Sequence, residues 1–396
     1  MISRARIALL LAYLSVPSIA GVIITPALPL IQANFKLNQS EVEWLISLFL
    51  VGYVFGQLIY GPIANRFGRL FALRTGLLVY FAGNLLCICA AHYMNYQLFE
   101  LGRLLAALGS ASGLSCTYML INELLPVEQR KTAMAYTIVS ATVGIGLAVS
   151  LGGIITEYWL WSGCFILLLL QNIVMFLGTF LFTETLTQKK PINIKTILNN
   201  YKEALKCETL VIFALAVGFC TIISYCFAAV APHIASDYLY LSPAEYGTWN
   251  LINMFGMLVG GLWSRKLLLR YKPIDVVVMG LGMSLLGIIN LLLMWKLQSN
   301  SPLWFFLSTT HLYLFSSIVL ASASFIASNA LSDKASGAAI MSFINMGSAT
   351  IAVIIISKLS TNLLLAFVEL LIGEWIFIMS LVLVYQYKRR ALFVRN

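Results

Sequence analysis

Chemistry in this sequence would depend on a few ionisable side chains that stand inside long apolar runs. Of the fifteen Asp and Glu residues, Glu369 and Glu374 fall well inside such a run. Among the three His residues, His311 lies inside one. An ionisable group inside a bilayer is costly, so each is a candidate for carrying a proton. The alternative is structural, with Glu374 bonded to a neighbouring helix and His311 bonded to a nearby hydroxyl.

Arg103 stands in another apolar run, at residues 97–121. A guanidinium does not lose its proton, so it must meet a carboxylate, a carbonyl, water or an anionic substrate. Glu100 lies one helical turn away and would be a local partner. We therefore hold two interpretations of Arg103, a structural pair with Glu100 and a role in proton coupling.

The composition requires a membrane to position these side chains. Hydrophobic residues make up 60% of the 396 residues and charged residues 10%, whereas soluble proteins carry about 25% charged residues. The net charge of +10 comes from short segments between apolar runs, so it indicates topology rather than nucleic-acid binding. Each apolar run is long enough to predict one transmembrane helix. The twelve runs are 7–31, 42–62, 71–91, 97–121, 133–156, 161–183, 209–232, 245–268, 274–296, 303–330, 337–357 and 363–386.

Basic residues predict the orientation of these helices. If both termini are cytoplasmic, 21 of the 25 Lys and Arg residues lie on the cytoplasmic side and four do not. Residues 184–208 carry five Lys and no long apolar run, so they predict a cytoplasmic linker. The chain then divides into six-helix bundles at 1–183 and 209–396.

The two halves share a short repeated pattern. The segment GQLIYGPIANR begins at Gly56, and the similar segment GMLVGGLWSRK begins at Gly256. Gly52 with Gly56, and Gly256 with Gly260, have the G-x-x-x-G spacing of closely packed membrane helices. Two repeated six-helix bundles with a site between them are a common architecture of secondary transporters.

Several segments resemble the major facilitator superfamily, and in detail its Bcr/CflA type of drug:proton antiporter. The resemblance implies an all-α membrane protein of twelve transmembrane helices in two pseudo-repeated six-helix bundles. It also implies transport by alternating access. The segments that carry it are ITPALPLI (24–31), GPIANRFGRL (61–70), LGRLLAALGSASG (101–113), GIGLAVSLGGIITEYWLW (144–161), SYCFAAVAPHIASDYLYLSPAEYG (224–247) and SDKASGAAIMSFINMGSA (332–349).

Two of these segments imply functional glycines and an ion-pair cluster. In the resembling family, an acidic residue at the place of Glu123 pairs with arginines of the loop after helix 2. We expect Gly61 and Pro62 to end that helix and Gly68 to permit the turn. We call the predicted cluster the inner latch: Gly61, Asn65, Arg66, Gly68, Arg69 and Glu123. The helix 5 signature contributes Gly144, Gly152 and Gly153.

The sequence departs from the family pattern at two informative places. Antiporters of this type usually have an acidic residue in helix 1, where this chain has only Val22 to Thr25. The loop after helix 2 usually has Asp at the place of Asn65. We expect a weaker inner latch and a proton site outside helix 1.

Helices 1, 4, 7 and 10 would line a substrate cavity in this family. The side chains there are mainly apolar and aromatic with few polar groups, which suits a small amphipathic ligand. The candidates on these helices are Tyr13, Ser18, Tyr118, Thr221, Tyr225, His311 and Tyr313, and Asn253 in helix 8 and Asn345 in helix 11 would add amide contacts.

We therefore expect a proton-coupled exporter of small amphipathic molecules. It would be a monomer that spans a bacterial inner membrane, with no cofactor, metal or nucleic-acid partner. The alternatives are a proton-coupled uptake symporter or facilitator and, more distantly, a receptor that does not transport. No H-E-x-x-H, G-x-S-x-G or Walker A pattern occurs, so the sequence does not indicate an enzyme.

Overall fold

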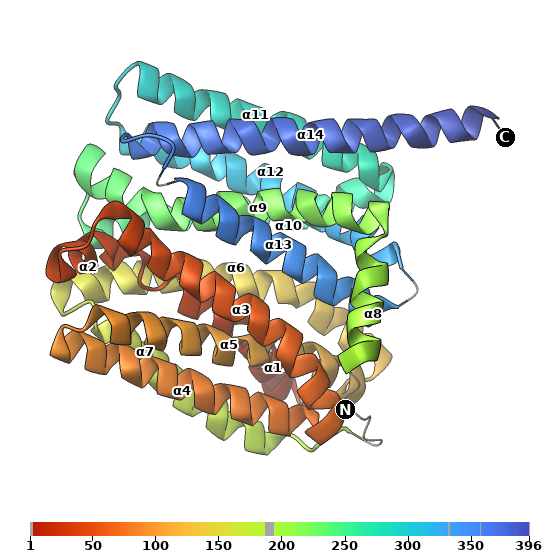
Figure 1. The fold of residues 1–396 in the computed structure, drawn as a ribbon, viewed down its shortest axis with the longest axis horizontal. Helices are drawn as coiled ribbons and strands as arrows, with labels where there is room; N and C mark the ends of the chain where they lie inside the picture. The colour runs from red at the N-terminus through yellow and green to blue at the C-terminus, as the bar shows by residue number, and fades with distance from the viewer. Residues whose placement is uncertain (1–2, 187–193, 332, 357, 396) are drawn as a thin grey trace. The chain divides into compact units, whose positions relative to one another are not determined.

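The structure is a computed structural model that describes residues 3–186, 194–331, 333–356 and 358–395. Helices dominate these residues, and no strand occurs among them (Figure 1). Single turns at Thr25–Ala27, Thr179–Leu181 and Ile234–Tyr238 are 3-10, 3-10 and π-helical. The α-helices are α1 (Arg4–Val22), α2 (Leu28–Phe35), α3 (Gln39–Phe67), α4 (Arg69–Tyr93), α5 (Tyr96–Leu124), α6 (Val127–Tyr158), α7 (Gly163–Gly178), α8 (Ile194–Leu205), α9 (Glu208–His233), α10 (Pro243–Arg270), α11 (Pro273–Lys296), α12 (Pro302–Asn329), α13 (Lys334–Ile356) and α14 (Leu363–Arg395).

The long helices match the predicted transmembrane runs. Eleven helical segments of the described chain are long and apolar enough to cross a membrane, the first of them running through α1 and α2. Helix α10 covers the remaining predicted run, 245–268, with 28 residues, but Asn250 and Asn253 dilute its apolar character. The prediction of an all-helical membrane protein is confirmed.

Short polar side chains cap the N-termini of several of these helices. The Asn38 side chain accepts a hydrogen bond from the Glu41 backbone N–H (2.9 Å), and the Glu41 carboxylate accepts one from the Asn38 N–H (2.8 Å). This reciprocal pair satisfies two N–H groups that the first turn of α3 leaves free. Asn95 caps α5 and Ser301 caps α12 with one such hydrogen bond each, which the side chain accepts from a backbone N–H of the first turn.

The chain forms two compact units. The first comprises residues 1–193 with 241–251, and the second comprises residues 194–240 with 252–396. The segment that the sequence predicts as a linker contains helix α8, which groups with the second unit. A search for long apolar runs misses α8 because this helix has 12 residues and is rich in polar side chains.

The repeated glycines bring one pair of helices together in each unit. In the first unit, a Cβ at Gly56 of α3 would lie 2.7 Å from the Leu108 carbonyl oxygen of α5. In the second unit, a Cβ at Gly256 of α10 would lie 2.7 Å from the Thr310 carbonyl oxygen of α12. Only glycine permits this approach of a helix to a neighbouring backbone. The sequence repeat therefore corresponds to the same helix packing in both units.

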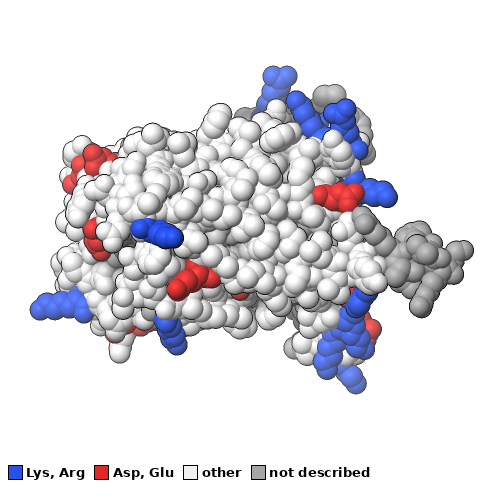
Figure 2. Space-filling view, turned by 90° about the horizontal axis from the view of Figure 1, so that it is seen from above, with Lys and Arg blue, Asp and Glu red and all other residues white. Residues whose placement is uncertain are grey.

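Charged side chains are sparse over the helix surfaces. Figure 2 shows Lys and Arg gathered mainly toward helix ends, with broad uncharged surface between them. Many large hydrophobic residues of the helices are exposed, including Leu269 (84%), Leu262 (67%) and Phe255 (64%) on α10. Exposed apolar side chains of this size are stable against lipid and unfavourable against water.

Candidate functional site

The inner latch lies within the first unit at the turn between α3 and α4. Helix α3 continues through Gly61 and Pro62 and ends at Phe67, so the prediction that it ends at Gly61 and Pro62 is wrong. Membrane helices tolerate an internal Pro because neighbouring groups satisfy the freed carbonyl. The turn is made at Gly68 alone, whose φ of +123° is unfavourable for residues that carry a side chain.

Arg69 is the centre of the inner latch. Its Nη2 lies 2.8 Å from Glu123 Oε1, and its Nε lies 3.2 Å from both Glu123 oxygens. The Nη1 atom donates to the Ala64 carbonyl (2.7 Å) and to Asn65 Oδ1 (2.9 Å). The guanidinium thus joins the end of α3 to the end of α5 with a paired hydrogen-bond geometry that Lys does not provide. Arg66 is exposed and contacts none of these groups.

Glu184 is a member of this cluster that sequence reasoning missed. Its two carboxylate oxygens accept from the backbone N–H groups of Arg69 (2.8 Å) and Leu70 (3.0 Å). Glu184 therefore caps the N-terminus of α4. Gly68, the residue at the N-cap position, has no side chain that could do so. The hydroxyl of Thr185 donates a short hydrogen bond to Glu123, so the segment after α7 contacts both parts of the latch.

The electrostatics of Glu184 follow from these contacts. Partial burial raises the pKa of the Glu184 carboxyl, but hydrogen bonds from backbone N–H groups of Leu186, Arg69, Leu70 and Thr185 outweigh it and bring the pKa below its usual value. Such hydrogen bonds favour the charged form of a carboxyl group. Glu184 is consequently ionised near neutral pH, which favours its position at the N-terminus of α4.

Arg103 lies in the core of the first unit, fully buried. Its Nη1 donates to the Ala20 carbonyl (2.9 Å) and its Nη2 to the Gly21 carbonyl (3.4 Å), both in the last turns of α1. The guanidinium carbon lies 4.4 Å from the centre of the Phe49 ring, a cation–π distance. Glu100, the predicted local partner, interacts with Trp44 and Tyr96. Arg103 thus links α5 to the place where α1 ends.

The glycines of the helix 5 signature lie on α6. A Cβ at Gly152 would collide with the Ile23 carbonyl oxygen, just after α1 ends, and a Cβ at Gly144 would lie 2.9 Å from Ser15 Cβ. A Cβ at Gly153 would collide with the Pro243 carbonyl oxygen, within the segment 241–251 that groups with the first unit. These glycines allow α6 to pack directly against neighbouring backbone.

Carboxylates within the spans differ widely in exposure. Glu374 on α14 is half-buried and Glu369, on the same helix, is exposed. Glu43 on α3 is 1% exposed, which makes it the one buried carboxylate among the described residues. Its Oε1 accepts a 2.7 Å hydrogen bond from Gln39 Nε2. Sequence reasoning missed Glu43 because it follows the helix start by only four residues, where an exposed position is the usual expectation.

His311 and Tyr313 point to different neighbours of α12. His311 Nε2 lies 2.9 Å from the Met283 carbonyl of α11, and its ring lies 4.7 Å from that of Phe315. Tyr313 instead packs edge-to-face on Phe227 of α9, with ring centres 5.7 Å apart. Two residues along a helix rotate the side chain by about 200°. The prediction that both line one cavity therefore conflicts with the packing of the second unit.

Two other cavity candidates of the second unit form polar contacts. Asn253 of α10 is buried, and its Oδ1 accepts from the hydroxyls of Thr309 and Thr310 of α12, each at 2.9 Å. Thr221 is 9% exposed and donates to the Val217 carbonyl of its own helix.

The remaining candidates differ in accessibility. Tyr225 and Asn345 are half-buried, as is Ser18 in the first unit. Tyr118 is 37% exposed. Tyr13 is fully buried and donates to the Met175 carbonyl of α7 (2.6 Å), so it offers no surface to a substrate in this structure.

Metal binding has no support in the described residues, among which no three His, Cys, Asp or Glu side chains lie close enough to hold an ion.

Comparison with known proteins places this geometry in a family context. A family model described as Major Facilitator Superfamily matches residues 9–357. Multidrug transporter MdfA of Edwardsiella piscicida is 27% identical over 257 residues, which cover 63% of this chain and 61% of that protein. Riboflavin transporter RibZ of Clostridioides difficile is 28% identical over 202 residues, which cover 49% of this chain and 42% of that protein. The chain thus matches about two-fifths to three-fifths of the length of these relatives.

Solved structures show the same fold at lower sequence identity. A crystal structure of a D-xylose-proton symporter superimposes with a TM-score of 0.78 at 14% identity, over 95% of this chain and 97% of that one. At this identity the likeness concerns the fold alone.

Proposed function

Because the chain belongs to the major facilitator superfamily of transporters, we propose that it exports small amphipathic molecules in exchange for protons. The observation that carries this proposal is the similarity to the multidrug transporter over 63% of the chain. Two six-helix halves would rock about a site near the middle of the membrane. Both termini would face the cytoplasm of a bacterial inner membrane, as the distribution of Lys and Arg favours.

Proton coupling in this proposal uses carboxylates outside helix 1. Glu43 is buried and Glu374 is half-buried, so both occupy positions where a permanent charge is costly. Glu374 has no bonded partner among the residues that the structure describes. His311 and Glu369 are the secondary candidates, because His311 is bonded to a backbone carbonyl and Glu369 is exposed. Arg103 would contribute by holding the end of α1 rather than by titrating.

The inner latch supports a cycle with two conformations. Arg69, Glu123 and Glu184 join three segments of the first unit at the end of the helices that would face the cytoplasm. Reversible opening of such a cluster requires bonds that are individually modest, and a partly exposed ion pair contributes about 0–1 kcal/mol. The cluster is therefore suited to stabilise one conformation without trapping it.

A second candidate is an uptake symporter or facilitator. It is favoured by the absence of an acidic residue at Val22 to Thr25 and by the partial similarity to a riboflavin transporter. In this case protons would move with the solute, or the solute would equilibrate without them.

Reconstitution in liposomes distinguishes the candidates. The purified chain is placed in vesicles with an acidic interior that contains a pH-sensitive dye. A lipophilic cation, an uncharged aromatic amphiphile or riboflavin is then added outside. Antiport predicts that an added solute raises the interior pH, and it predicts slower proton movement for Glu43→Gln or Glu374→Gln than for Glu203→Gln, an exposed control.

Other outcomes favour other functions. Solute entry without any pH change favours a facilitator, and entry driven by an acidic exterior favours a symporter. Binding of a solute without flux favours a receptor. Coupled flux that persists unchanged in both carboxylate variants refutes their role in carrying protons while it leaves antiport standing.

A further inference from the structure

A groove between α11 and α12 is lined by polar groups, of which the proposed transport cycle involves only His311, as a secondary proton candidate. It has a volume of about 410 Å³, within the range of small-molecule sites. Both helices belong to the second unit. The lining residues are Asn290, Ser301, Leu303, Trp304, Leu307, Ser308 and His311.

Asn290 stands on a surface that should otherwise face lipid. It is exposed on α11 beside Leu286, Ile289 and Leu293, which are 47%, 41% and 42% exposed. An amide in hydrocarbon without a hydrogen-bond partner is strongly unfavourable. Within the described part of the chain, the Asn290 side chain has no such partner. Its position requires a ligand or another polar group from outside the chain.

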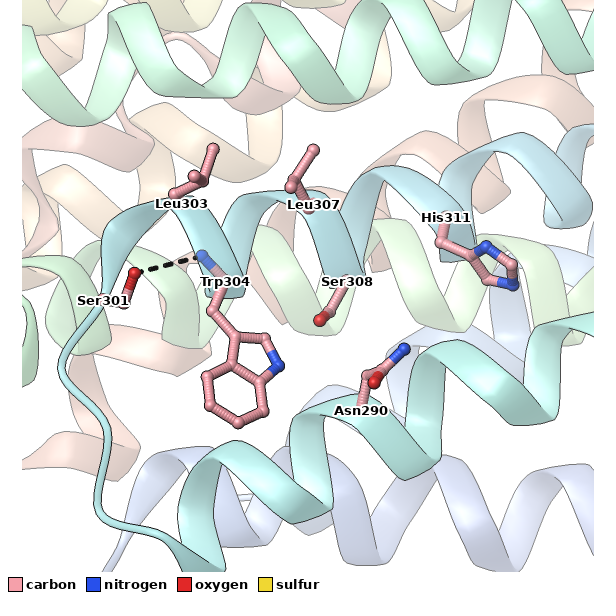
Figure 3. A pocket seen from close by; sticks show the side chains of 7 residues that line it. All are labelled: Asn290, Ser301, Leu303, Trp304, Leu307, Ser308 and His311. Carbon is pink, nitrogen blue, oxygen red and sulfur yellow. Dashed lines mark hydrogen bonds between the residues drawn. The ribbon is translucent and has the colours of Figure 1, made fainter.

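Ser308 adds an independent indication of a ligand. It is 4% exposed, and its hydroxyl has no hydrogen-bond partner among the described residues. Figure 3 shows Ser308 and Trp304 from α12 and Asn290 from α11 directed into the space between the two helices. The part of Ser308 that stays accessible includes this hydroxyl, so it can hydrogen-bond a polar atom of a molecule that occupies the groove.

The donors and acceptors of the groove define the chemistry of its ligand. His311 Nε2 lies 2.9 Å from a carbonyl, which only accepts, so Nε2 carries the proton and Nδ1 is an acceptor in the neutral ring. Asn290 and Ser308 both donate and accept, and the Trp304 indole N–H donates. None of the seven lining residues is Lys, Arg, Asp or Glu, so the groove offers no counter-charge to an ionic headgroup.

The apolar part of the groove fits a hydrocarbon chain. Leu303 and Leu307 are each 52% exposed at its rim. Asn290 lies six residues before the end of α11, about 9 Å along the axis. On the proposed topology this is the outer half of the membrane, where a lipid headgroup can reach the amide.

We propose that this groove binds an amphiphile with an uncharged, hydroxyl-bearing headgroup. The headgroup hydrogen-bonds to Asn290, Ser308 and His311, and the hydrocarbon chain lies over Leu303 and Leu307. The site lies between α11 and α12 within the second unit, and the proposal holds whichever solute is transported.

Trp304 provides a direct readout of binding. The purified chain in phosphatidylcholine nanodiscs is titrated with a monoacylglycerol whose acyl chain is brominated, and bromine quenches nearby indoles. The chain has eight Trp residues, so the signal is the difference between the chain and its Trp304→Phe variant. Phosphatidylcholine and phosphatidylglycerol with the same brominated chain test whether an uncharged headgroup is preferred.

The proposal expects saturable Trp304 quenching by the monoacylglycerol and weaker quenching by the two phospholipids. Asn290→Leu and Ser308→Ala should each weaken binding by roughly three- to tenfold, as expected for one lost hydrogen bond. Leu286→Ala, on the same exposed face of α11, serves as the matched control and should leave binding unchanged. Ser308→Ala removes a single oxygen, so it keeps the test valid if Asn290→Leu folds poorly.

Two results would overturn the proposal. Equal quenching by all three lipids, unaffected by Ser308→Ala, would show an ordinary lipid-facing surface. Dimerisation in nanodiscs that Asn290→Leu abolishes would show that a second copy of the chain covers the amide.

Discussion

Replacing Glu184 by Gln tests whether the carboxylate that caps α4 stabilises the first unit. The two carboxylate oxygens accept separately from the N–H groups of Arg69 and Leu70, at 2.8 and 3.0 Å. Gln keeps one acceptor oxygen but turns an NH₂ group toward the other donor, and it removes the negative charge from the helix N-terminus. We expect Glu184→Gln to lower stability by about 1 kcal/mol, within the range for loss of a helix cap.

The pH dependence of this effect has a definite sign. Because the pKa of Glu184 is lower in the folded chain, its carboxylate stabilises the fold fully above the unfolded value of about 4.3. That stabilisation is lost as the pH falls through the lower pKa of the folded state. The difference in the free energy of unfolding between the unmodified chain and Glu184→Gln should therefore be full at pH 7, largely kept at pH 5, and reduced at lower pH.

Thermal unfolding in detergent, followed by circular dichroism, measures this effect. A loss of 1 kcal/mol in a unit of about 200 residues corresponds to roughly 2–4 °C in Tm. The control is Glu203→Gln, which removes an exposed carboxylate that pairs with Lys206 at 2.7 Å and should have little effect. If Glu184→Gln and Glu203→Gln have the same Tm at pH 7, the capping argument is refuted.

Three further substitutions, one of them with a matched control, test the packing and polar contacts of the first unit. Arg69→Lys keeps the charge but loses the paired guanidinium contacts, so thermal unfolding should show a loss of about 1–3 kcal/mol. Gly152→Val places a side chain against the Ile23 carbonyl and should destabilise by about 1–3 kcal/mol, whereas Gly61→Ala, with open space around its Cβ, should melt unchanged. Asn65→Asp gives Arg69 Nη1 a charged acceptor in place of the amide oxygen that lies 2.9 Å from it. A stronger inner latch should reduce the labelling of cysteines introduced on the cytoplasmic side. Unchanged labelling would contradict this prediction.

Hydropathy predicted the helices because a segment that crosses the bilayer must satisfy its backbone hydrogen bonds internally, as a helix does. It could not predict which faces of a helix meet. His311 and Tyr313 are two residues apart in sequence, yet they contact α11 and α9 respectively, and only packing decides this. The end of α3 was misplaced at Pro62 because soluble helices break at an internal Pro, whereas α3 continues to Phe67.

Charge contacts between distant segments were equally hard to predict. Arg69 and Glu123 were paired by family resemblance, and their contact is present at 2.8 Å. Glu184 stands 115 residues from Arg69 in a polar segment with no motif, so nothing in its neighbourhood indicated that it caps α4. The sequence around Glu184, FTETLT, does not show that this residue caps a helix. That role becomes visible only when the first turn of α4 is known to lie beside it.

The repeat provides a common frame in which the two units can be compared position by position. Gly56 of α3 packs on the Leu108 carbonyl of α5, and Gly256 of α10, its counterpart in the repeat, packs on the Thr310 carbonyl of α12. These contacts place α3 with α10 and α5 with α12 in the repeat. Residues at the same distance from these contacts in the two units therefore occupy equivalent positions.

Equivalent positions carry different polar groups in the two units. Arg103 stands five residues before Leu108 in the first unit, and Phe305 stands five residues before Thr310 in the second. Asn253, three residues before Gly256, meets Thr309, and Tyr53 stands three residues before Gly56. The first unit thus holds a buried cation, 4.4 Å from the Phe49 ring, at a position where the second unit holds a buried phenyl ring. Since the backbone contacts at the repeat are alike, we expect any functional difference between the halves to come from side chains such as these.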